Sequence, residues 1–404
     1  MSSILSKLTF LALIFSSFTI WFSLGDYVRL NFLFIFIAFV LNLFHSSKKK
    51  PLFKSSKNTK LQRFFILATL FFIFISFLVN SSINYQPKLV INTIGTFMIV
   101  FILYFYYSSL IENYLSIDSC IKGLAYGSVL LMTIIFVDSI LVNFANIEIH
   151  NWFIINHEGN TDYFRRSFWT SPCSPCEEPG AAAHYLNVLI PFSYYYFKGI
   201  KRVLIIILYI FCLFSLFSST GLATVLILAL LYTFLELKGL KKFIPLLIIL
   251  ALIILYNKLY STNPMIRTMI DEWAFIDKIT LSGNTGSDME RQELWGCAIS
   301  DGLASPIVGM GPGWGKWAHP SYLSTYLMFL GNYGIFAFLT FLGFWLTFLK
   351  KCFKLPPKYK NIFLFAFISC SIAAAIAELV HSFILWMLLP VINKIYNKTK
   401  SNKL

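Results

Sequence analysis

Long apolar runs separated by short polar segments dominate the chain. Many runs approach 20 residues, the length with which a helix crosses a hydrocarbon core about 30 Å thick. The pattern predicts an all-α polytopic membrane protein, with one transmembrane domain over residues 1–404. The first run is interpreted as a retained helix, because no small-residue cleavage site of a signal peptide follows it. Twelve helices are expected at about 8–24, 28–44, 62–80, 89–110, 121–144, 179–197, 203–218, 221–237, 243–257, 321–349, 361–378 and 380–396.

Charge refines this picture. Hydrophobic residues make up 57% of the chain and charged residues only 13%, whereas soluble domains carry about 25% charged residues. The net charge of +15 comes from lysine clusters in short segments beside the apolar runs, at 48–60, 198–202, 238–242, 350–360 and 394–403. Such clusters mark cytoplasmic loops in membrane proteins. We therefore expect both termini in the cytoplasm and no binding of nucleic acid.

Two long loops then fall outside the cell membrane, at about 145–178 and 258–320, the larger one between the ninth and tenth helices. Loops of this length in a compact protein are usually functional or disordered. The larger loop is rich in tryptophan and in both signs of charge. Its segment MERQELWGCAIS has a helical spacing of apolar residues, which predicts a short helix carrying Arg291 and ending near Gly302.

His319 follows the glycine-rich stretch GMGPGWGKWA, at the start of the predicted tenth helix. A neutral imidazole can take a proton from a hydroxyl near neutral pH. Considered alone, however, His319 is more simply explained as a histidine that caps backbone groups in an irregular loop.

Arginines in the outside loops suggest an anion site. The guanidinium fork of Arg291 matches phosphate oxygens, although an ion pair with Glu290 or Asp288 is the simpler alternative. Arg165, Arg166 and Arg267 share its outside position, where positive charge is otherwise sparse. This favours an anion-binding role for the group.

Other polar residues have simpler structural explanations. Glu178 precedes Pro179 at a predicted helix start, where negative charge is favourable, and His184 one turn later is expected to pack. Asp138 lies within the fifth predicted helix. Glu378 and His381 can share a helix face, and we favour a structural hydrogen bond there over a proton relay.

The segment SPCSPCEEP places Cys173 and Cys176 in a CxxC motif. A disulfide in an oxidising compartment is compatible with this spacing. Redox catalysis is not expected, because no thioredoxin-like strand and helix surround the motif. A single CxxC is also a weak zinc signal, so no metal site is predicted.

The segment RQELWGCAISDGLASPIVGMGPGWGKWAHPSYLSTYLMFLGNYGIFAF resembles the signature region of the bacterial O-antigen ligase and O-antigen polymerase superfamily. That pattern has an Arg–Trp helix, a P-x-x-G-x-G turn, a histidine before a helix, and a glycine-containing span. Matching residues here are Arg291, Trp295, Pro306, Gly309, Gly311, His319, Gly331 and Gly334.

A second segment, FRRSFWTSPCSPCEEPGAAAHYL, resembles the family's other outside motif, an arginine followed by Glu-Pro at a helix start. The turn in FSLFSSTGLATVLIL departs from the family, since Thr220 stands where an arginine often follows serine. The resemblance covers the second half of the chain well. It covers the first five helices only through their topology.

The resemblance implies a metal-independent, cofactor-free inverting glycosyltransferase of the bacterial inner membrane, with its active site facing the periplasm. Such enzymes move a glycan from undecaprenyl diphosphate to a sugar hydroxyl, during synthesis of lipopolysaccharide, capsule or exopolysaccharide. The acceptor is lipid A core for a ligase and a second lipid-linked glycan for a polymerase.

By this resemblance Arg291, with Arg165 or Arg166, would hold the diphosphate, and His319 would position or deprotonate the acceptor hydroxyl. The glycine loop would let backbone approach the substrate closely. The implied substrate-binding set is Arg165, Arg166, Arg267, Glu178, Trp295, Gly309, Gly311 and Trp317.

Two rival functions remain open at this point. A twelve-helix secondary transporter or lipid-linked glycan exporter would show matched halves and polar residues deep in the membrane, and here the halves do not match. A scaffold would leave the pattern of Arg, Gly and His without an explanation. An enzyme is expected to gather Arg291, Arg165 or Arg166, and His319 in one outward-facing cavity.

Overall fold

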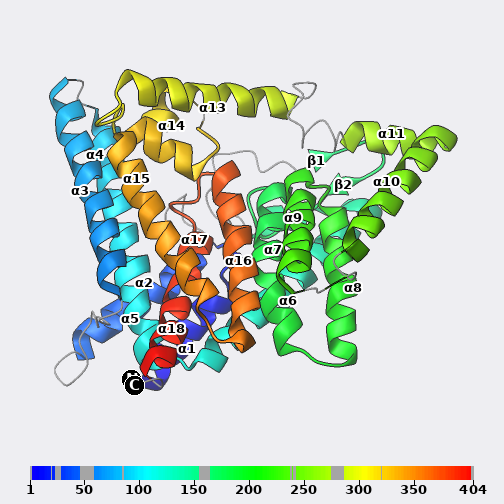
Figure 1. Ribbon diagram of the computed structural model, residues 1–404, viewed down its shortest axis with the longest axis horizontal. Helices are drawn as coiled ribbons and strands as arrows, with labels where there is room; N and C mark the ends of the chain where they lie inside the picture. Colours follow the sequence, from blue (N-terminus) through cyan, green and yellow to red (C-terminus); the bar gives the residue numbers. More distant parts are fainter. Residues whose placement is uncertain are drawn as a thin grey trace.

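The computed structural model describes residues 2–19, 21–22, 29–45, 59–83, 86–153, 164–236, 239, 243–273, 286–319 and 321–401. Within these ranges the protein is helical, apart from a small antiparallel pair formed by β1 (Phe164–Arg165) and β2 (Thr170–Ser171) (Figure 1). The predicted all-α class is confirmed.

Five helical segments of the described chain are long and apolar enough to cross a membrane. They are α3 (Lys60–Ile83), the continuous α4–η2–α5 segment (Pro87–Tyr114), α6–η3 (Ile117–Ala145), α15 (Thr325–Phe353) and α16 (Pro357–Ile376). Their bounds follow the predicted runs within a few residues. These helices support a membrane-embedded protein.

Other predicted spans form shorter or interrupted helices. The first, α1 (Ser2–Ile14), has 13 residues and is about 20 Å long, less than the hydrocarbon thickness. The last apolar run divides into α17 (Phe383–Met387) and α18 (Leu389–Ser401). The remaining apolar helices are α2 (Leu30–His45), α7 (Pro179–Tyr196), α8 (Ile200–Ser215), α9 (Ser219–Glu236) and α10 (Ile244–Thr262). A total of twelve spans therefore remains a prediction.

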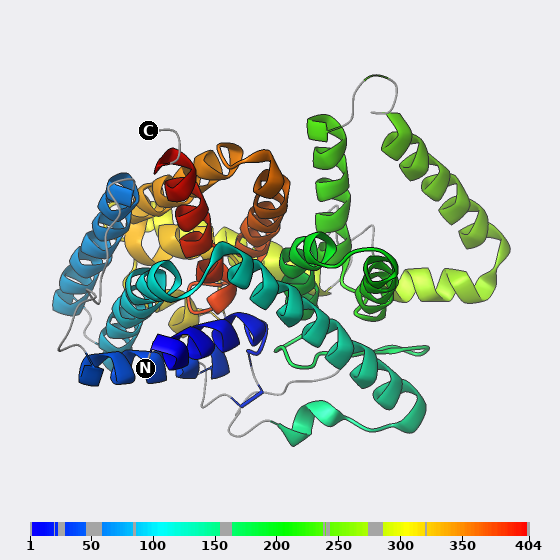
Figure 2. The same cartoon turned by 90° about the horizontal axis from the view of Figure 1, so that it is seen from below.

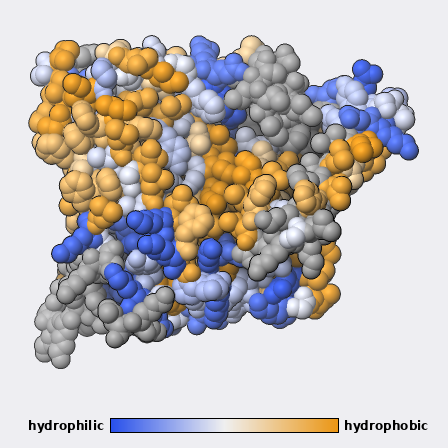
Figure 3. Space-filling model, viewed as in Figure 1, coloured by the Kyte–Doolittle hydropathy of each residue, from blue (hydrophilic) through white to orange (hydrophobic). Residues whose placement is uncertain are grey.

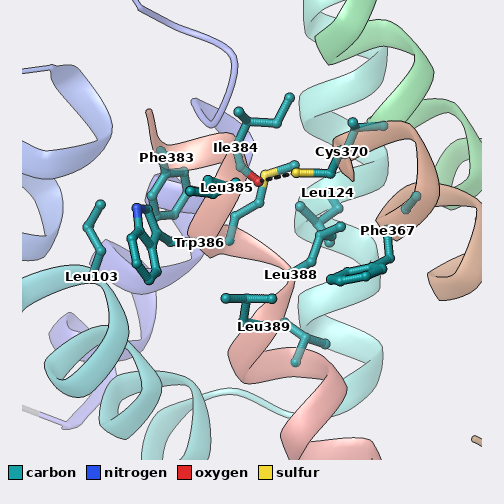
Figure 4. Close-up of a cluster of buried hydrophobic side chains, with 14 of the residues drawn as sticks. Leu103, Leu124, Phe367, Cys370, Phe383, Ile384, Leu385, Trp386, Leu388 and Leu389 are labelled. Atoms are coloured by element: carbon teal, nitrogen blue, oxygen red, sulfur yellow. Dashed lines mark hydrogen bonds between the residues drawn. The ribbon is translucent and has the colours of Figure 1, made fainter. Parts of the chain in front are cut away.

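One buried hydrophobic cluster takes side chains from α1 at one end of the chain to α18 at the other. Figure 4 shows its part around α17, where Trp386 lies beside Leu103 of η2, and Phe367 and Cys370 come from α16. The thiol of Cys370 donates to the carbonyl oxygen of Ile384, at 3.4 Å. The short α17 is thus held in the interior by helices from both halves of the sequence.

The outer surface of the helices is apolar as well. On α3 the side chains of Phe64, Leu67 and Phe71 are all more than half exposed. Apolar residues cover much of the face shown in Figure 3, and polar residues gather along its lower edge and around α11 (Pro264–Trp273). A soluble monomer rarely exposes apolar patches of this extent, whereas a bilayer covers them.

Two helices of the loop predicted to lie outside cover one end of the helices. Helix α13 (Gly286–Ala304) lies across the upper end in Figure 1, next to the short α14 (Trp314–Ala318). The predicted short helix carrying Arg291 is confirmed as α13. Helices α1 and α18 lie at the opposite end, which Figure 2 shows from below.

Candidate functional site

The glycine-rich loop is joined to a kink in α15. Gly334 interrupts that helix with φ +80° and ψ 179°, a conformation that favours glycine. The backbone groups freed by the kink pair with the loop: Met310 N donates to Gly331 O, Gly311 N to Asn332 O, and Ile335 N to Pro306 O, at 2.8–2.9 Å. These bonds satisfy polar backbone that a broken membrane helix would otherwise expose.

The glycines of the loop are required by contacts within the protein. A Cβ on Gly309 would lie 2.4 Å from the backbone of Asn332, and one on Gly313 would lie 2.2 Å from Asn92 Nδ2. Gly309 and Gly311 also have positive φ angles, +65° and +113°. The sequence predicted that these glycines let the backbone approach a substrate. In this structure they let it pack closely against α15 and α4. A role of these two glycines toward substrate stays a prediction.

A single carboxylate oxygen organises the surroundings of His319. Oδ2 of Asp301, near the end of α13, accepts hydrogen bonds from Tyr322 OH at 2.5 Å and from Trp314 Nε1 at 3.1 Å. Nε2 of His319 lies 3.3 Å from the same oxygen. We call Asp301, Trp314, His319 and Tyr322 the Asp301 cluster. It joins α13, α14 and the start of α15.

The geometry of the Asp301 cluster is compatible with a histidine oriented by an acid. A carboxylate beside one ring nitrogen of a histidine stabilises the imidazolium that forms when the other nitrogen takes a proton. Burial and the hydrogen bond to Asp301 raise the pKa of the Tyr322 hydroxyl well above its usual range, so the phenol stays a proton donor. The backbone N of Tyr322 donates to Glu378 Oε1 at 2.7 Å; Glu378 and His381 lie between α16 and α17 and do not share the predicted helix face.

A second group of charges lies around the start of α7. Arg29 donates to Glu177 Oε1 at 2.8 Å and to Ser382 Oγ at 3.0 Å. Glu178 precedes the first residue of α7. Burial first, and then the neighbouring Glu177 and Glu290, raise the pKa of Glu178, while the charge of Arg291 opposes them. We call Arg29, Glu177, Glu178 and Arg291 the Glu178 cluster.

Arg291 keeps donor capacity in this cluster. Its Nε is buried, and no atom of the described residues accepts a hydrogen bond from it. Buried donors in folded proteins are rarely left without an acceptor. An oxyanion bound beside Arg291 would supply one, and the guanidinium geometry suits two oxygens at once.

One face of α13 connects the two clusters. At 100° per residue, Arg291, Trp295 and Asp301 project from the same side of the helix, together with the buried Leu294 and Ala298. Asp301 lies about 15 Å further along the helix axis than Arg291, at 1.5 Å per residue. His319, the other predicted catalytic residue, lies beside Asp301, so Arg291 and His319 are at opposite ends of this stretch of α13.

The other predicted arginines lie elsewhere. Arg165 forms an ion pair with Glu148, and its side chain is 60% exposed. Arg166 donates to Ser171 Oγ at 2.7 Å and lies 5.0 Å from the ring centre of Phe217. Arg267 sits on α11 with Asp271, on the opposite side of the molecule from α14 in Figure 1. The partners named for these three arginines thus belong neither to the Asp301 cluster nor to the Glu178 cluster.

The two predicted tryptophans differ in exposure. Trp295 donates from Nε1 to Leu323 O at 3.3 Å, which fastens α13 onto the loop before α15. Trp317 is 42% exposed and lies against Trp314, with ring centres 4.6 Å apart. Trp317 therefore presents an aromatic surface next to the Asp301 cluster.

Sequence reasoning did not select Asp301, Tyr322 or Arg29 as site residues. Asp301 was one of several acids in the larger loop, and its partners are defined only when α14 folds back beneath α13. Arg29 carried a usable signal, because it is a lone arginine where an apolar run begins, on the predicted outer side. Its bond to Glu177 now connects α2 to the start of α7.

The remaining candidates are structural. His184 Nε2 lies 3.5 Å from Thr220 Oγ1 in the interior, as expected for a packed histidine. Cys173 and Cys176 are both buried with free thiols, so the CxxC motif forms no disulfide here. Cys176 donates from its sulfur to Ser17 O at 3.3 Å.

No protein-family model matches the chain, and no curated protein matches it either.

Proposed function

We propose that the protein is a membrane glycosyltransferase that moves an oligosaccharide or polysaccharide from a lipid diphosphate to a sugar hydroxyl, in the manner of the O-antigen ligases and polymerases. The observation that carries the proposal is the pairing of His319 Nε2 with Asp301 Oδ2 at 3.3 Å. This contact orients the imidazole of His319 just before the start of α15, so that His319 could act as a base.

In the proposed reaction the acceptor hydroxyl oxygen attacks the anomeric carbon of the donor sugar. The new C–O bond forms as the bond from that carbon to the diphosphate oxygen breaks, with inversion. The hydroxyl proton passes to the His319 nitrogen that faces away from Asp301. The lipid diphosphate leaves with the electron pair, and Arg291 stabilises the negative charge that develops. No metal step is included.

In this proposal the groups of the substrates are arranged in order along the common face of α13. The diphosphate would bind at Arg291, the first sugar near Trp295 one turn along, and the acceptor hydroxyl at His319. Glu178 would lie beside the diphosphate at Arg291, and Arg165, Arg166 and Arg267 would act further out on the glycan or the lipid. We further propose twelve spans, cytoplasmic termini and a site facing the periplasm of a bacterial inner membrane, on the basis of the lysine clusters.

The test is a gel of surface glycan from a strain that lacks the native gene. The strain is complemented with wild type, His319→Ala, Asp301→Asn or Arg291→Ala. Arg202→Ala is the matched control, because Arg202 lies in the first turn of α8, and α8 begins at the opposite end of the helices from α13 (Figure 1). The site variants should fail to restore glycan, and Arg202→Ala should restore it.

The gel pattern also distinguishes the possible activities. Bare lipid A core with long lipid-linked chains identifies a ligase, and core carrying single repeats identifies a polymerase. Lipid-linked glycan retained on the cytoplasmic face identifies a transporter instead. If the site variants restore the wild-type pattern at normal membrane levels, the enzymatic proposal is wrong.

A further inference from the structure

A small pocket opens beside the Asp301 cluster, between the glycine-rich loop and the ends of α3 and α4. Its volume is about 180 Å³. Trp314 and Trp317 form one wall, and the residues opposite include Asn80, Gln86 and Lys88. Ile83, Leu89, Met310 and Pro312 complete a largely apolar lining, so the pocket combines two indole rings and aliphatic side chains with two amides and one ammonium group.

This combination fits a sugar ring better than a lipid chain. The C–H face of a pyranose is apolar, and its slightly positive hydrogens are attracted to the negative face of an indole ring. Its hydroxyls need donors and acceptors around the ring edge, which side-chain amides supply. An acyl chain would offer no hydrogen bond to Gln86, to Lys88 or to the Oδ1 atom of Asn80.

The pocket is also held in shape by the protein. Asn80 Nδ2 donates to Ser76 O at 2.8 Å and to Gly309 O at 3.3 Å, which leaves its Oδ1 as an acceptor. Trp314 is fixed by its bond to Asp301. The Trp314 ring and the Asn80 amide are therefore oriented before a ligand binds, which lowers the entropic cost of binding.

A hydrogen bond from Trp314 links the pocket to the Asp301–His319 pair. Asp301 Oδ2 accepts from Trp314, which lines the pocket, and lies beside His319. Arg291 and the Glu178 cluster lie toward the other end of α13. A sugar in this pocket would therefore lie near the end of α13 that carries Asp301, away from the proposed diphosphate position at Arg291, as an acceptor would.

We propose that this pocket binds one pyranose ring of the acceptor glycan. The identification as acceptor rests on the proposed function, whereas binding of a sugar rests on the pocket alone. Trp317 is the residue to test, because it is 42% exposed and its replacement leaves the core intact.

The experiment is saturation-transfer NMR on the full chain in nanodiscs. The probes are methyl pyranosides of common hexoses and N-acetylhexosamines. Wild type should transfer magnetisation to the ring protons of at least one probe. Trp317→Ala should weaken its binding roughly three- to tenfold, the contribution of a good ring contact, and Trp317→Phe should retain it. Trp152→Ala is the control, since Trp152 is 66% exposed on η4 (Ile149–Trp152).

Gln86→Ala provides a second variant, and it should also weaken binding. Absence of signal from every probe, or wild-type signal in both Trp317→Ala and Gln86→Ala, would overturn the pocket assignment. The His319→Ala gel keeps the two proposals separate. If glycosides bind but that variant makes normal glycan, the pocket stands and the enzymatic function fails. If the gel responds but no glycoside binds, the reverse holds.

Discussion

The Nε2 atom of His319 lies 3.3 Å from the Oδ2 atom of Asp301, the same oxygen to which Tyr322 donates at 2.5 Å. Two donors besides the histidine fix that oxygen, so the imidazole is oriented by a carboxylate that cannot easily turn away. Orientation of a histidine by an acid is the arrangement found in catalytic triads.

Asp301→Asn should therefore lower glycan transfer about 100-fold, within the range that a positioned base contributes. The amide keeps an oxygen for Tyr322 but no longer stabilises an imidazolium. Glu293→Gln on the exposed face of α13 is the matched control and should be neutral. Activity is measured as the rate of glycan transfer in isolated membranes. Equal activity of Asp301→Asn and wild type would remove Asp301 from the mechanism.

Hydropathy was enough to predict the five long apolar segments. The expected run 62–80 became α3 (Lys60–Ile83), and 361–378 became α16 (Pro357–Ile376). Hydropathy failed where a run contains its own helix break. The run 380–396 divides before Leu389, and Pro390, in the first turn of α18, was the available signal.

The candidate site was predictable only in part. Composition and motif spacing selected Arg291 and His319, because those residue types suit phosphate and proton chemistry. Their partners depend on tertiary structure, since Asp301 meets His319 only after the loop folds against the kinked α15. The kink itself depends on Gly334, which the motif included without indicating its conformation.

Arg291→Lys should retain the charge but lose the paired donors. We expect transfer to fall about 10- to 100-fold, less than the 10²–10³-fold typical for removing an oxyanion donor outright. Arg291→Ala should show that larger loss. Initial rates at several donor concentrations check this, with Arg202→Lys as the control. A lysine variant with wild-type rates would mean that Arg291 does not bind two oxygens of the leaving group.

Gly334→Ala should destabilise the fold. Its φ is +80°, and an added Cβ would lie 2.5 Å from the carbonyl oxygen of Ile307. Strain and overpacking together cost about 2–5 kcal/mol. Gly296→Ala on α13 meets no atom within 4 Å and should be neutral or slightly stabilising. Thermal unfolding in detergent, followed by size-exclusion chromatography, compares them. A Gly334→Ala variant as stable as Gly296→Ala would contradict the described kink.

Glu178 should make stability depend on pH. Its folded-state pKa is raised from 4.5, chiefly by burial, so the folded protein binds the proton more tightly than the unfolded chain. Stability is then lost as pH rises from 4.5 through the raised folded-state pKa. Glu178→Gln removes this dependence, so the melting temperature of the variant should rise relative to wild type with increasing pH over that window. If the melting temperatures of Glu178→Gln and wild type changed equally with pH over that window, burial of the carboxyl group would be contradicted.

The most direct test of the central claim uses purified protein in nanodiscs, with lipid-linked glycan extracted from the gene-deletion strain. The quantity measured is carrier-lipid diphosphate released in the presence of acceptor. Wild type should release it in proportion to glycan transferred, and His319→Ala and Asp301→Asn should both release at least about 100-fold less. Release at the wild-type rate by both folded variants would show that the His319–Asp301 pair is not the catalytic base.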